Sequence, residues 1–280
     1  MYNYIDKDFN KDFTKHCSLL FQMEEQQYAY AIYEKRSGQL QVLKSVQLNA
    51  VSPADMLNKL KISVTSEDVL QVPFHEIKVG ICYTPFTLIP RVIFEEDKQR
   101  NYLELTAPVV AEDNVLVNNI NKLFIKNVFS VPQPELNYLD EIYTSPKIFH
   151  IGTALLENAV RNRDDFFEQQ LILDIKPGVI HILYFEKKEF KFMNQFRFVN
   201  KDDFLYYVLL VSDQYNIDRE NCDLKLSGEI MPDSLLFGEL WKFFKTISFV
   251  PINENIVLPK ELQEKPFYYY NTLMSLDLCE

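Results

Sequence analysis

The sequence predicts an α/β protein built from two similar lobes. The stretch from Gln169 to Phe249 shows the periodicity of three strands, a helix, a strand and a second helix, in that order. Residues 1–105 show a looser form of the same series. A mixed strand-and-helix unit that occurs twice is typical of a two-lobed α/β protein.

Apolar and polar residues alternate in the expected strands. In the first copy the expected strands are His16–Met23, Gln27–Glu34, Gln39–Leu48 and His75–Tyr83, and Ser52 followed by Pro53 opens a helix. In the second copy the expected strands are Gln169–Lys176, Gly178–Glu186, Glu189–Val199 and Asp223–Gly228, and the expected helices are Lys201–Tyr215 and Asp233–Lys245.

Matching positions recur at nearly constant offsets between the copies. An offset of 152 residues relates Tyr28, Tyr30, Ile32 and Glu34 to Ile180, Ile182, Tyr184 and Glu186. An offset of 150 residues relates Leu40, Val42, Val46 and Leu48 to Phe190, Phe192, Phe196 and Phe198. An offset of 147 residues relates Ile77–Val79 to Leu224–Leu226. One match alone is weak, because alternating strands align by chance. The ordered set predicts two structural copies, and the changes of offset fall in turns and in the helix region, where length varies easily.

The middle of the chain has a segment without a counterpart in the second copy. Val115–Ile120 and Leu123–Val131 are expected to form a hairpin, Phe86–Ile89 a loop, and Val92–Leu103 and Glu135–Tyr143 helices; Lys147–Ile151 is an expected strand, and Gly152 leads into a further helix. The predicted lobes are therefore residues 1–166, with a hairpin insertion near 114–131, and residues 167–280, with a C-terminal tail. We expect any ligand to lie between the lobes, at the carboxyl ends of strands.

Composition argues against several classes of partner. The chain of 280 residues has a formal net charge of −11 and no stripe of Lys and Arg, so we expect no nucleic acid to bind. No apolar run approaches the roughly 20 residues of a membrane-spanning helix, and the acidic start is unlike a signal peptide. We expect a cytoplasmic protein with no membrane insertion. Its oligomeric state is not predicted.

The cysteine, histidine and glycine residues predict neither a metal site nor a phosphate-binding loop. Four cysteines and four histidines are scattered without the spacing of metal ligands, which predicts reduced thiols and no metal site. The chain has only six glycines, although loops that hold phosphates with backbone amides need glycine. No catalytic triad or P-loop pattern is present, so no catalytic residue is predicted.

Three segments resemble motifs of the superfamily of actin, hexokinase and the DnaK-type ATPases. Thr153–Ala159 is similar to its connecting helix, Leu173–Gly178 stands where its second phosphate loop belongs, and Leu226–Glu229 stands where its adenosine-side strand ends. More narrowly, Tyr83–Pro90, His150–Leu155 and Leu278–Glu280 resemble a bacterial family of unknown function with this fold. The resemblance implies an actin-like ATPase (ribonuclease H-like) fold over nearly the whole chain.

Both phosphate loops depart from the superfamily pattern. In the second loop Asp174 and Gly178 match the pattern, but Lys176 replaces a glycine and Ile180 replaces the threonine. In the first loop Gln22 occupies the position of the aspartate and Glu24 that of the glycine, and Glu25 adds a further carboxylate. Carboxylates close to a polyphosphate are repulsive. We therefore expect no cofactor, with Mg·ATP considered and judged not to bind. The resemblance leaves Asp174, Gly178, Gly228 and Glu229 as candidate residues of the cleft.

Several single residues have two interpretations. Asp174 could hold a water or hydrated metal, or could accept backbone N–H groups of the Lys176–Gly178 turn. Gly228 could admit an adenine ring, or let the strand turn. Phe267–Tyr270 could be a tail strand packed on a lobe, or an exposed aromatic patch for a partner. The phenylalanines at 190, 192, 196 and 198 are expected on one core face.

Three functions follow as hypotheses. The first is a catalytically silent actin-like protein that binds or organises partner proteins. The second is an ATP-dependent enzyme, a small-molecule kinase or ATPase that uses Asp174 and a rearranged loop. The third is a pocket protein that holds another small ligand in the cleft.

Overall fold

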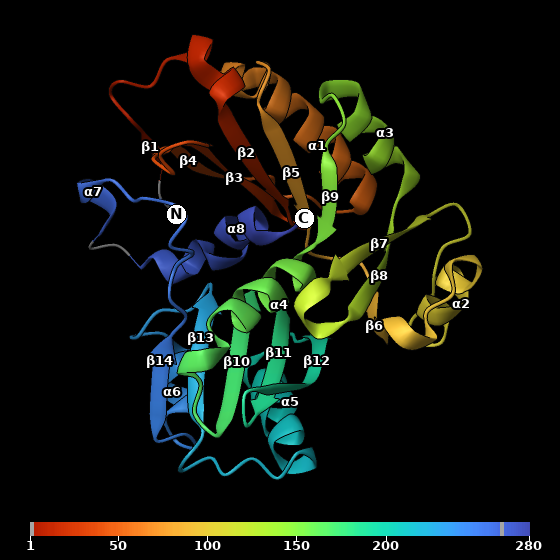
Figure 1. The fold of residues 1–280 in the computed structure, drawn as a ribbon, viewed down its shortest axis with the longest axis vertical. Helices are drawn as coiled ribbons and strands as arrows, with labels where there is room; N and C mark the ends of the chain where they lie inside the picture. Colours follow the sequence, from red (N-terminus) through yellow and green to blue (C-terminus); the bar gives the residue numbers. More distant parts are fainter. Residues whose placement is uncertain (1–2, 264–265) are drawn as a thin grey trace. The chain divides into compact units, whose positions relative to one another are not determined.

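The chain folds into two compact units (Figure 1). The structure, a computed structural model, describes residues 3–263 and 266–280. Unit 1 comprises Met1–Glu157, Glu254–Gln263 and Leu273–Glu280, and unit 2 comprises Asn158–Asn253 and Glu264–Thr272. The expected boundary at 166/167 thus differs from the observed one, and the tail that was expected in the second lobe is divided between the units. The physical reason is that tail residues pair with unit 1: the Leu40 amide donates to the carbonyl of Val257, for example.

The strands and helices follow in chain order. Unit 1 holds β1 (Tyr4–Ile5), β2 (Cys17–Met23), β3 (Gln27–Glu34), β4 (Leu40–Gln47), α1 (Pro53–Ser66), β5 (Glu76–Ile81), β6 (Phe86–Pro90), α2 (Gln99–Glu104), β7 (Asn114–Ile120), β8 (Ile125–Val131), α3 (Gln133–Ile142), β9 (Lys147–His150) and α7 (Lys260–Gln263). Unit 2 holds β10 (Gln169–Lys176), β11 (Val179–Glu186), β12 (Glu189–Arg197), α5 (Lys201–Gln214), β13 (Asp223–Gly228), α6 (Leu235–Leu240) and β14 (Thr246–Phe249). The chain passes between the units within α4 (Ile151–Arg161) and α8 (Asn271–Ser275).

The main sheets of the two units have the same topology, as the repeat predicted. The strand order is β1-β4-β3-β2-β5-β9 in unit 1 and β12-β11-β10-β13-β14 in unit 2. In each sheet the first three strands of the repeat pair antiparallel and the two later strands join in parallel. Two edge strands, β1 and β14, were not predicted. β1 has only two residues, which is too short to show a period.

Both hairpins carry a β-bulge at the equivalent position. In unit 1, Ile32 pairs with Val42 but Tyr33 pairs with Leu40; in unit 2, Tyr184 pairs with Phe192 but Phe185 pairs with Phe190. A bulge inserts one residue and changes the face to which the following side chains point. The two copies therefore agree in backbone detail as well as in strand order.

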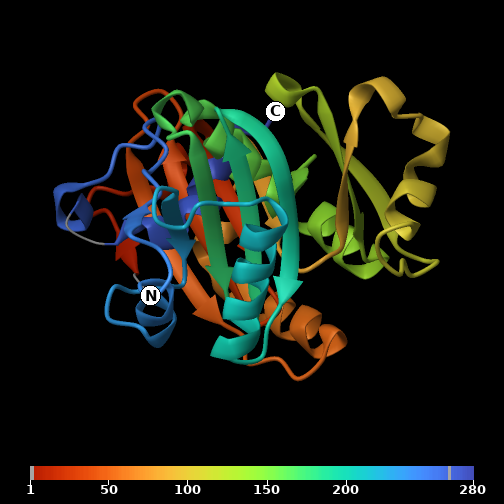
Figure 2. The same cartoon turned by 90° about the horizontal axis from the view of Figure 1, so that it is seen from below.

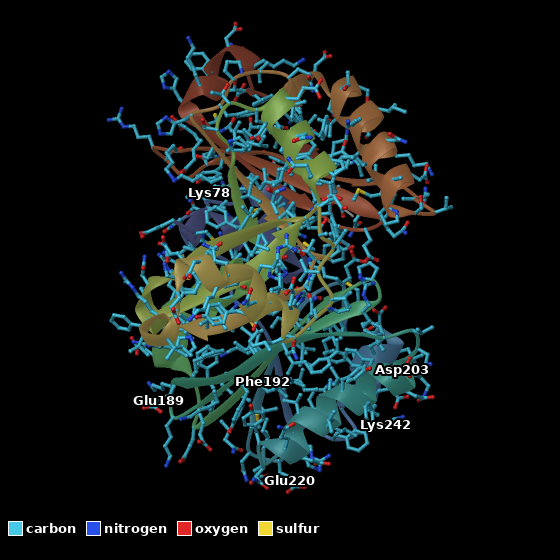
Figure 3. All side chains as sticks on the ribbon, turned by 90° about the vertical axis from the view of Figure 1, so that its right-hand side faces the viewer. Lys78, Glu189, Phe192, Asp203, Glu220 and Lys242 are labelled. Carbon is cyan, nitrogen blue, oxygen red and sulfur yellow. The ribbon has the colours of Figure 1, made fainter. Side chains whose placement is uncertain are left out.

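The helix that follows each hairpin is also capped in the same way. Ser52 accepts the amide of Asp55, and the Asp55 carboxylate accepts the amide of Val51. The corresponding residue in the first turn of α5 is Asp203, which is labelled in Figure 3. Asn200 accepts the amide of Asp203, whose carboxylate accepts the amide of Val199 at 3.0 Å. Each reciprocal pair satisfies backbone N–H groups that a helix start leaves without partners.

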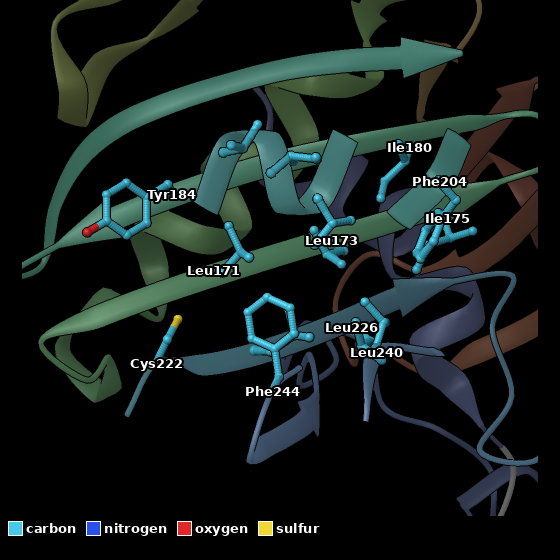
Figure 4. Close-up of a cluster of buried hydrophobic side chains, with 14 of the residues drawn as sticks. Leu171, Leu173, Ile175, Ile180, Tyr184, Phe204, Cys222, Leu226, Leu240 and Phe244 are labelled. Carbon is cyan, nitrogen blue, oxygen red and sulfur yellow. The ribbon is translucent and has the colours of Figure 1, made fainter. Parts of the chain in front are cut away.

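In unit 2, α5 packs against one face of the sheet (Figure 2). The core between them joins alternate residues of β10, β11 and β13 to one stripe of the helix (Figure 4). Its buried members include Leu171, Leu173, Ile180, Ile182, Leu224, Leu226, Phe204, Val208 and Val211. Each such side chain stabilises the fold by about 1.5–3 kcal/mol. Phe192, Phe196 and Phe198 pack against this core, as predicted.

Phe190 does not share that face. The bulge at Phe185 pairs it with Phe190, and the two rings meet edge-on at 5.6 Å, next to the Phe166–Phe185 contact at 5.2 Å. The prediction of one stripe of four phenylalanines is thus wrong for Phe190, because a bulge inverts the alternation.

The insertion in unit 1 is a three-stranded sheet of order β6-β8-β7. The predicted hairpin is present as β7 and β8. The loop predicted at Phe86–Ile89 is wrong, because these residues form β6 and pair antiparallel with β8. The helix predicted at Val92–Leu103 is reduced to α2, preceded by short 3-10 turns.

The tail segment Phe267–Tyr270 is a 3-10 helix rather than the expected strand. Phe267 and Tyr270 are buried, and the ring of Tyr268 stacks on that of Phe249 in β14 at 3.9 Å. The tail therefore packs on unit 2 while leaving part of its aromatic surface accessible.

Candidate functional site

The first loop follows β2 in unit 1 and is organised around the buried carboxylate of Glu24. The side-chain amide of Gln22 donates to one oxygen at 2.5 Å, and that of Gln27 donates to the other at 2.6 Å. Gln47 in β4 donates to the amide oxygen of Gln27 at 2.7 Å, which keeps the Gln27 nitrogen turned toward Glu24. The loop is closed by the Glu24 amide, which donates to the carbonyl of Gln27.

This arrangement places negative charge where a phosphate loop would present amide donors. A second anion at 4 Å from Glu24 would be repelled by about 4 kcal/mol at an effective dielectric constant of 20. Glu25, the next residue, is exposed and adds another carboxylate. The loop is chemically suited to a cationic or neutral group.

A cavity of about 290 Å³ adjoins this loop within unit 1. Glu25, Gln26, Ser52, Met56 and Tyr83 are among the residues that line it. Behind Tyr83 lies Glu135, which is buried and accepts the tyrosine hydroxyl hydrogen bond. Burial raises the pKa of Glu135 to about 7, although the hydrogen bond from Tyr83 opposes the shift.

The second loop, in unit 2, is a two-residue turn between β10 and β11. Lys176 pairs with Val179, so only Pro177 and Gly178 form the turn. Gly178 has φ +73°, a conformation that glycine adopts freely, and its carbonyl accepts the amide of Phe198 at 3.0 Å. Proline followed by a glycine of positive φ is the sequence of a type II turn. A turn this short has few free amides for phosphate oxygens.

Asp174 lies two residues before this turn and is fully buried. Its Oδ1 accepts the hydroxyl of Ser227 in β13 at 2.7 Å, and its Oδ2 lies 3.8 Å from Nδ1 of His181. Burial, together with the charge of Lys176, lowers the pKa of His181 to about 3 against a hydrogen bond with Gln195, so the imidazole is neutral at pH 7. The contact is thus not an ion pair. The Ser227 bond shows a cross-strand role for Asp174, and its water-holding and turn-capping roles stay predictions.

Gly228 ends β13 with φ +83°, and its backbone touches that of β10. A Cβ atom at this position would lie 2.1 Å from the carbonyl oxygen of Ile175, to which the Glu229 amide donates at 2.6 Å. This close approach explains the glycine without any ligand. Glu229 bonds to the hydroxyl of Tyr269, and burial together with this carboxylate raises the tyrosine pKa. The structure thus brings Asp174, Gly228 and Glu229 to the carboxyl ends of β10 and β13, and Gly178 to the adjoining turn.

Two of the three motifs that carry the narrower family resemblance meet at His150, which sequence reasoning left without a role. His150 Nδ1 accepts the amide of Gly152 at 3.0 Å, so that nitrogen carries no proton and Nε2–H faces the carbonyl of Thr84 at 3.2 Å. Its ring lies against Phe86 and Phe129, with centroids at 4.4 and 5.6 Å.

Buried polar side chains extend this cluster into the insertion sheet. Asn118 Oδ1 accepts the amide of His150 and the hydroxyl of Thr153, both at 3.0 Å, and the Asn127 amide donates to Thr153 at 3.0 Å. The motifs Tyr83–Pro90 and His150–Leu155 therefore fasten β6, β7 and β8 to β9 and α4. The signal in the sequence was the recurrence of polar residues within apolar strands.

Two searches of the described residues are negative. Within residues 3–263 and 266–280, no group of three or more His, Cys, Asp or Glu side chains is arranged to hold a metal ion. Over the same residues, no helix has both the length and the apolar character needed to cross a membrane.

Comparison with solved structures gives the fold. A protein of unknown function with an actin-like ATPase fold from Bacteroides thetaiotaomicron VPI-5482 superposes with a TM-score of 0.79, at 21% identity over 86% of this chain and 93% of that one. The PilM–PilN type IV pilus biogenesis complex matches with a TM-score of 0.56, at 10% identity over 93% of this chain and 97% of that one. These likenesses show that the chain has the actin-like ATPase fold, as the sequence predicted.

Sequence comparison gives the family. None of the curated proteins compared with the chain matches it. The family described as "Protein of unknown function (DUF3822)" matches residues 6–247, and the chain belongs to this family.

Proposed function

We propose that this chain is a non-catalytic binding protein that uses the actin-like fold as a platform for a partner protein and binds no Mg·ATP. The observation that carries the proposal is the Glu24 carboxylate, which fills the first loop and is held there by the amides of Gln22 and Gln27. The two side-chain amides that could donate to a phosphate are thus engaged by the carboxylate of the loop itself.

The second loop supports the same conclusion. The turn at Pro177 and Gly178 is too short to wrap a phosphate, and Asp174 is buried against Ser227 rather than exposed for a metal. Gly228 is accounted for by the approach of β13 to β10. The four candidate residues thus have structural explanations of their own.

A surface of unit 2 supports protein binding. We call it the α6 aromatic surface and define it as Met231, Leu235, Phe237, Trp241, Phe249 and Tyr268. The rings of Phe237, Phe249 and Tyr268 are stacked in sequence, with centroids 6.0 and 3.9 Å apart, and Trp241 meets Phe237 edge-on. Trp241, the single tryptophan of the chain, is 49% exposed and Leu235 is 65% exposed. Rigid, partly exposed aromatic side chains are the residues that dominate binding at protein interfaces.

The cysteines support a reducing compartment. All four lie in the described residues and are buried thiols outside any disulfide. Burial raises the pKa of Cys222 to about 12, which makes this thiol unreactive. We accordingly assign the protein to the bacterial cytoplasm.

Calorimetry with Mg·ATP and a phosphate-release assay test the first half of the proposal. We expect neither heat of binding nor release from the wild-type chain. Micromolar binding with turnover, abolished by Asp174→Ala in a folded variant, would establish the alternative, an ATP-dependent enzyme such as a small-molecule kinase or ATPase.

Site-specific photo-crosslinking in cells tests the second half. A photoreactive residue placed at Trp241 should give a discrete adduct with one protein, whereas the same residue at Val199, which is 95% exposed in the same unit, should give none. The purified partner should then shift the emission of Trp241. Equal labelling from both positions would contradict the α6 aromatic surface as a docking site.

A further inference from the structure

A second cavity in unit 1, of about 420 Å³, lies at the start of β2, the end opposite to the Glu24 loop. Its lining includes Asp8, Phe9, Phe13, His16, Glu34 and Arg36. Cavities of roughly 300–1,000 Å³ with apolar walls and a few convergent polar groups are the usual binding sites of small molecules.

The walls of this cavity are held from both ends. β1 pairs with β4, and the amide of Asp6 then donates to the carbonyl of Gln41 at 2.8 Å. At the other end, the amide of Lys35 donates to the carbonyl of His16 at 3.1 Å. Between them the 3-10 helix Lys11–His16 is anchored by buried Thr14. A cavity with fixed walls binds a ligand without the entropic cost of ordering those walls.

The charged groups of the cavity are available to a ligand. Throughout residues 3–263 and 266–280, the Arg36 guanidinium and the Asp8 carboxylate find no hydrogen-bond or ion-pair partner. Among the side chains of the same described residues, Glu34 accepts only the Ser37 hydroxyl, at 2.5 Å. The nearby Asp6 differs, because its carboxylate is occupied by the Tyr4 hydroxyl and the Asp8 amide.

The apolar part of the lining comes from two phenylalanines. Phe13 is 63% exposed, and its ring contacts the imidazole of His16 with a centroid distance of 6.4 Å. Together with Phe9 it offers aromatic surface on which an apolar group could be shielded from water.

We propose that this cavity binds a small zwitterion with an apolar side chain, a ligand of the amino-acid class. Its carboxylate would pair with Arg36, its ammonium group with Asp8 and Glu34, and its side chain would lie against Phe9 and Phe13. A guanidinium matches a carboxylate with two parallel hydrogen bonds, and carboxylates bind an ammonium group by charge-assisted bonds. A purely anionic ligand would be repelled by Asp8 and Glu34, and a purely cationic one by Arg36.

Titration calorimetry of the full chain with three matched probes tests the assignment. L-phenylalanine carries both charges, phenethylamine lacks the carboxylate, and 3-phenylpropionate lacks the ammonium group. We expect saturable binding of L-phenylalanine, and binding about ten-fold weaker or more for each of the other two, since a charge-assisted bond contributes at least this factor.

Two variants then assign each charge to its partner. Arg36→Gln should weaken the binding of L-phenylalanine about ten-fold but should not weaken that of phenethylamine, whose ammonium group the arginine repels. Asp8→Asn should weaken the binding of L-phenylalanine but should not weaken that of 3-phenylpropionate, whose carboxylate the aspartate repels. Arg197→Gln, at an exposed arginine of unit 2, is the matched control and should change neither. Unchanged thermal unfolding midpoints would show that the variants are folded.

Absence of saturable L-phenylalanine binding at millimolar concentration would overturn the proposal. An Arg36→Gln substitution that weakened the binding of phenethylamine as much as that of L-phenylalanine would also overturn it, because the arginine would then not pair with the ligand carboxylate. Either result would leave the partner-binding function intact, because that function rests on unit 2 and on the Glu24 loop.

Discussion

The ammonium group of Lys78, in β5, donates a hydrogen bond to the carbonyl oxygen of Cys279 at 2.6 Å, across 201 residues of sequence. It also donates to the carbonyl of Asp277 at 2.8 Å. Lys78 is buried, and burial lowers its pKa despite the nearby Glu76 carboxylate. The lysine thus fastens the segment Leu278–Glu280, one of the motifs of the family resemblance, to the sheet of unit 1.

Replacing Lys78 by Met should lower the free energy of unfolding by about 3 kcal/mol, because one buried and one partly buried carbonyl lose a charged donor. Denaturation in urea measures the change. Lys147→Met is the matched control: Lys147 also pairs with Glu76, at 2.9 Å, but its side chain is half exposed, so the loss should stay below about 1 kcal/mol. Equal losses in the two variants would contradict the fastening role.

Gly228→Ala should be among the most destabilising glycine substitutions. Its φ of +83° disfavours alanine, and the new Cβ would lie 2.1 Å from the Ile175 carbonyl, so we expect a loss above about 3 kcal/mol. Gly238→Ala is the opposite case. Gly238 lies within α6 with no atom near its Cβ position, and alanine there should stabilise by about 0.5–1 kcal/mol. Thermal unfolding of both variants checks the contrast, and a mild effect at Gly228 would refute the close approach.

Glu135 should make stability depend on pH. Its folded pKa of about 7 lies above its usual value of 4.5, so its contribution is present at acid pH and is lost as pH rises through 7. Between pH 5 and 8 the free energy of unfolding of the wild type should fall by up to about 3 kcal/mol relative to that of Glu135→Gln. In this variant the amide oxygen still accepts the Tyr83 hydroxyl. Comparing urea denaturation of the two proteins cancels the other titrating groups. Parallel pH profiles would show that Glu135 does not titrate in this range.

The stability of the protein should depend on the acceptor oxygen of Asp174 more than on its charge. Asp174→Ala leaves the buried Ser227 hydroxyl without its acceptor and should destabilise by about 2 kcal/mol, whereas Asp174→Asn keeps an oxygen for that bond and should destabilise by less than about 1 kcal/mol. Chemical denaturation distinguishes them. If the two variants lost the same stability, the Ser227 bond would not be what Asp174 contributes.

The family motifs show where sequence reasoning ends. Tyr83–Pro90, His150–Leu155 and Leu278–Glu280 could be recognised as motifs, but their roles are contacts between segments far apart in the chain, such as His150 with Asn118 and Lys78 with Cys279. Likewise, the position of Glu24 in the first loop followed from the repeat offset. Its pairing with Gln22 and Gln27 required the folded backbone.

By itself the sequence determined the two-copy α/β architecture, most strand positions, the helix opened by Ser52 and the helix start at Lys201, because periodicity and capping act between residues close in the chain. Only the tertiary structure decided that Phe86–Pro90 is a strand, that Phe190 turns from the core and that the tail divides between the units. Strand pairing and bulges depend on partners distant in sequence, and a short edge strand gains its hydrogen bonds only when those partners are in place.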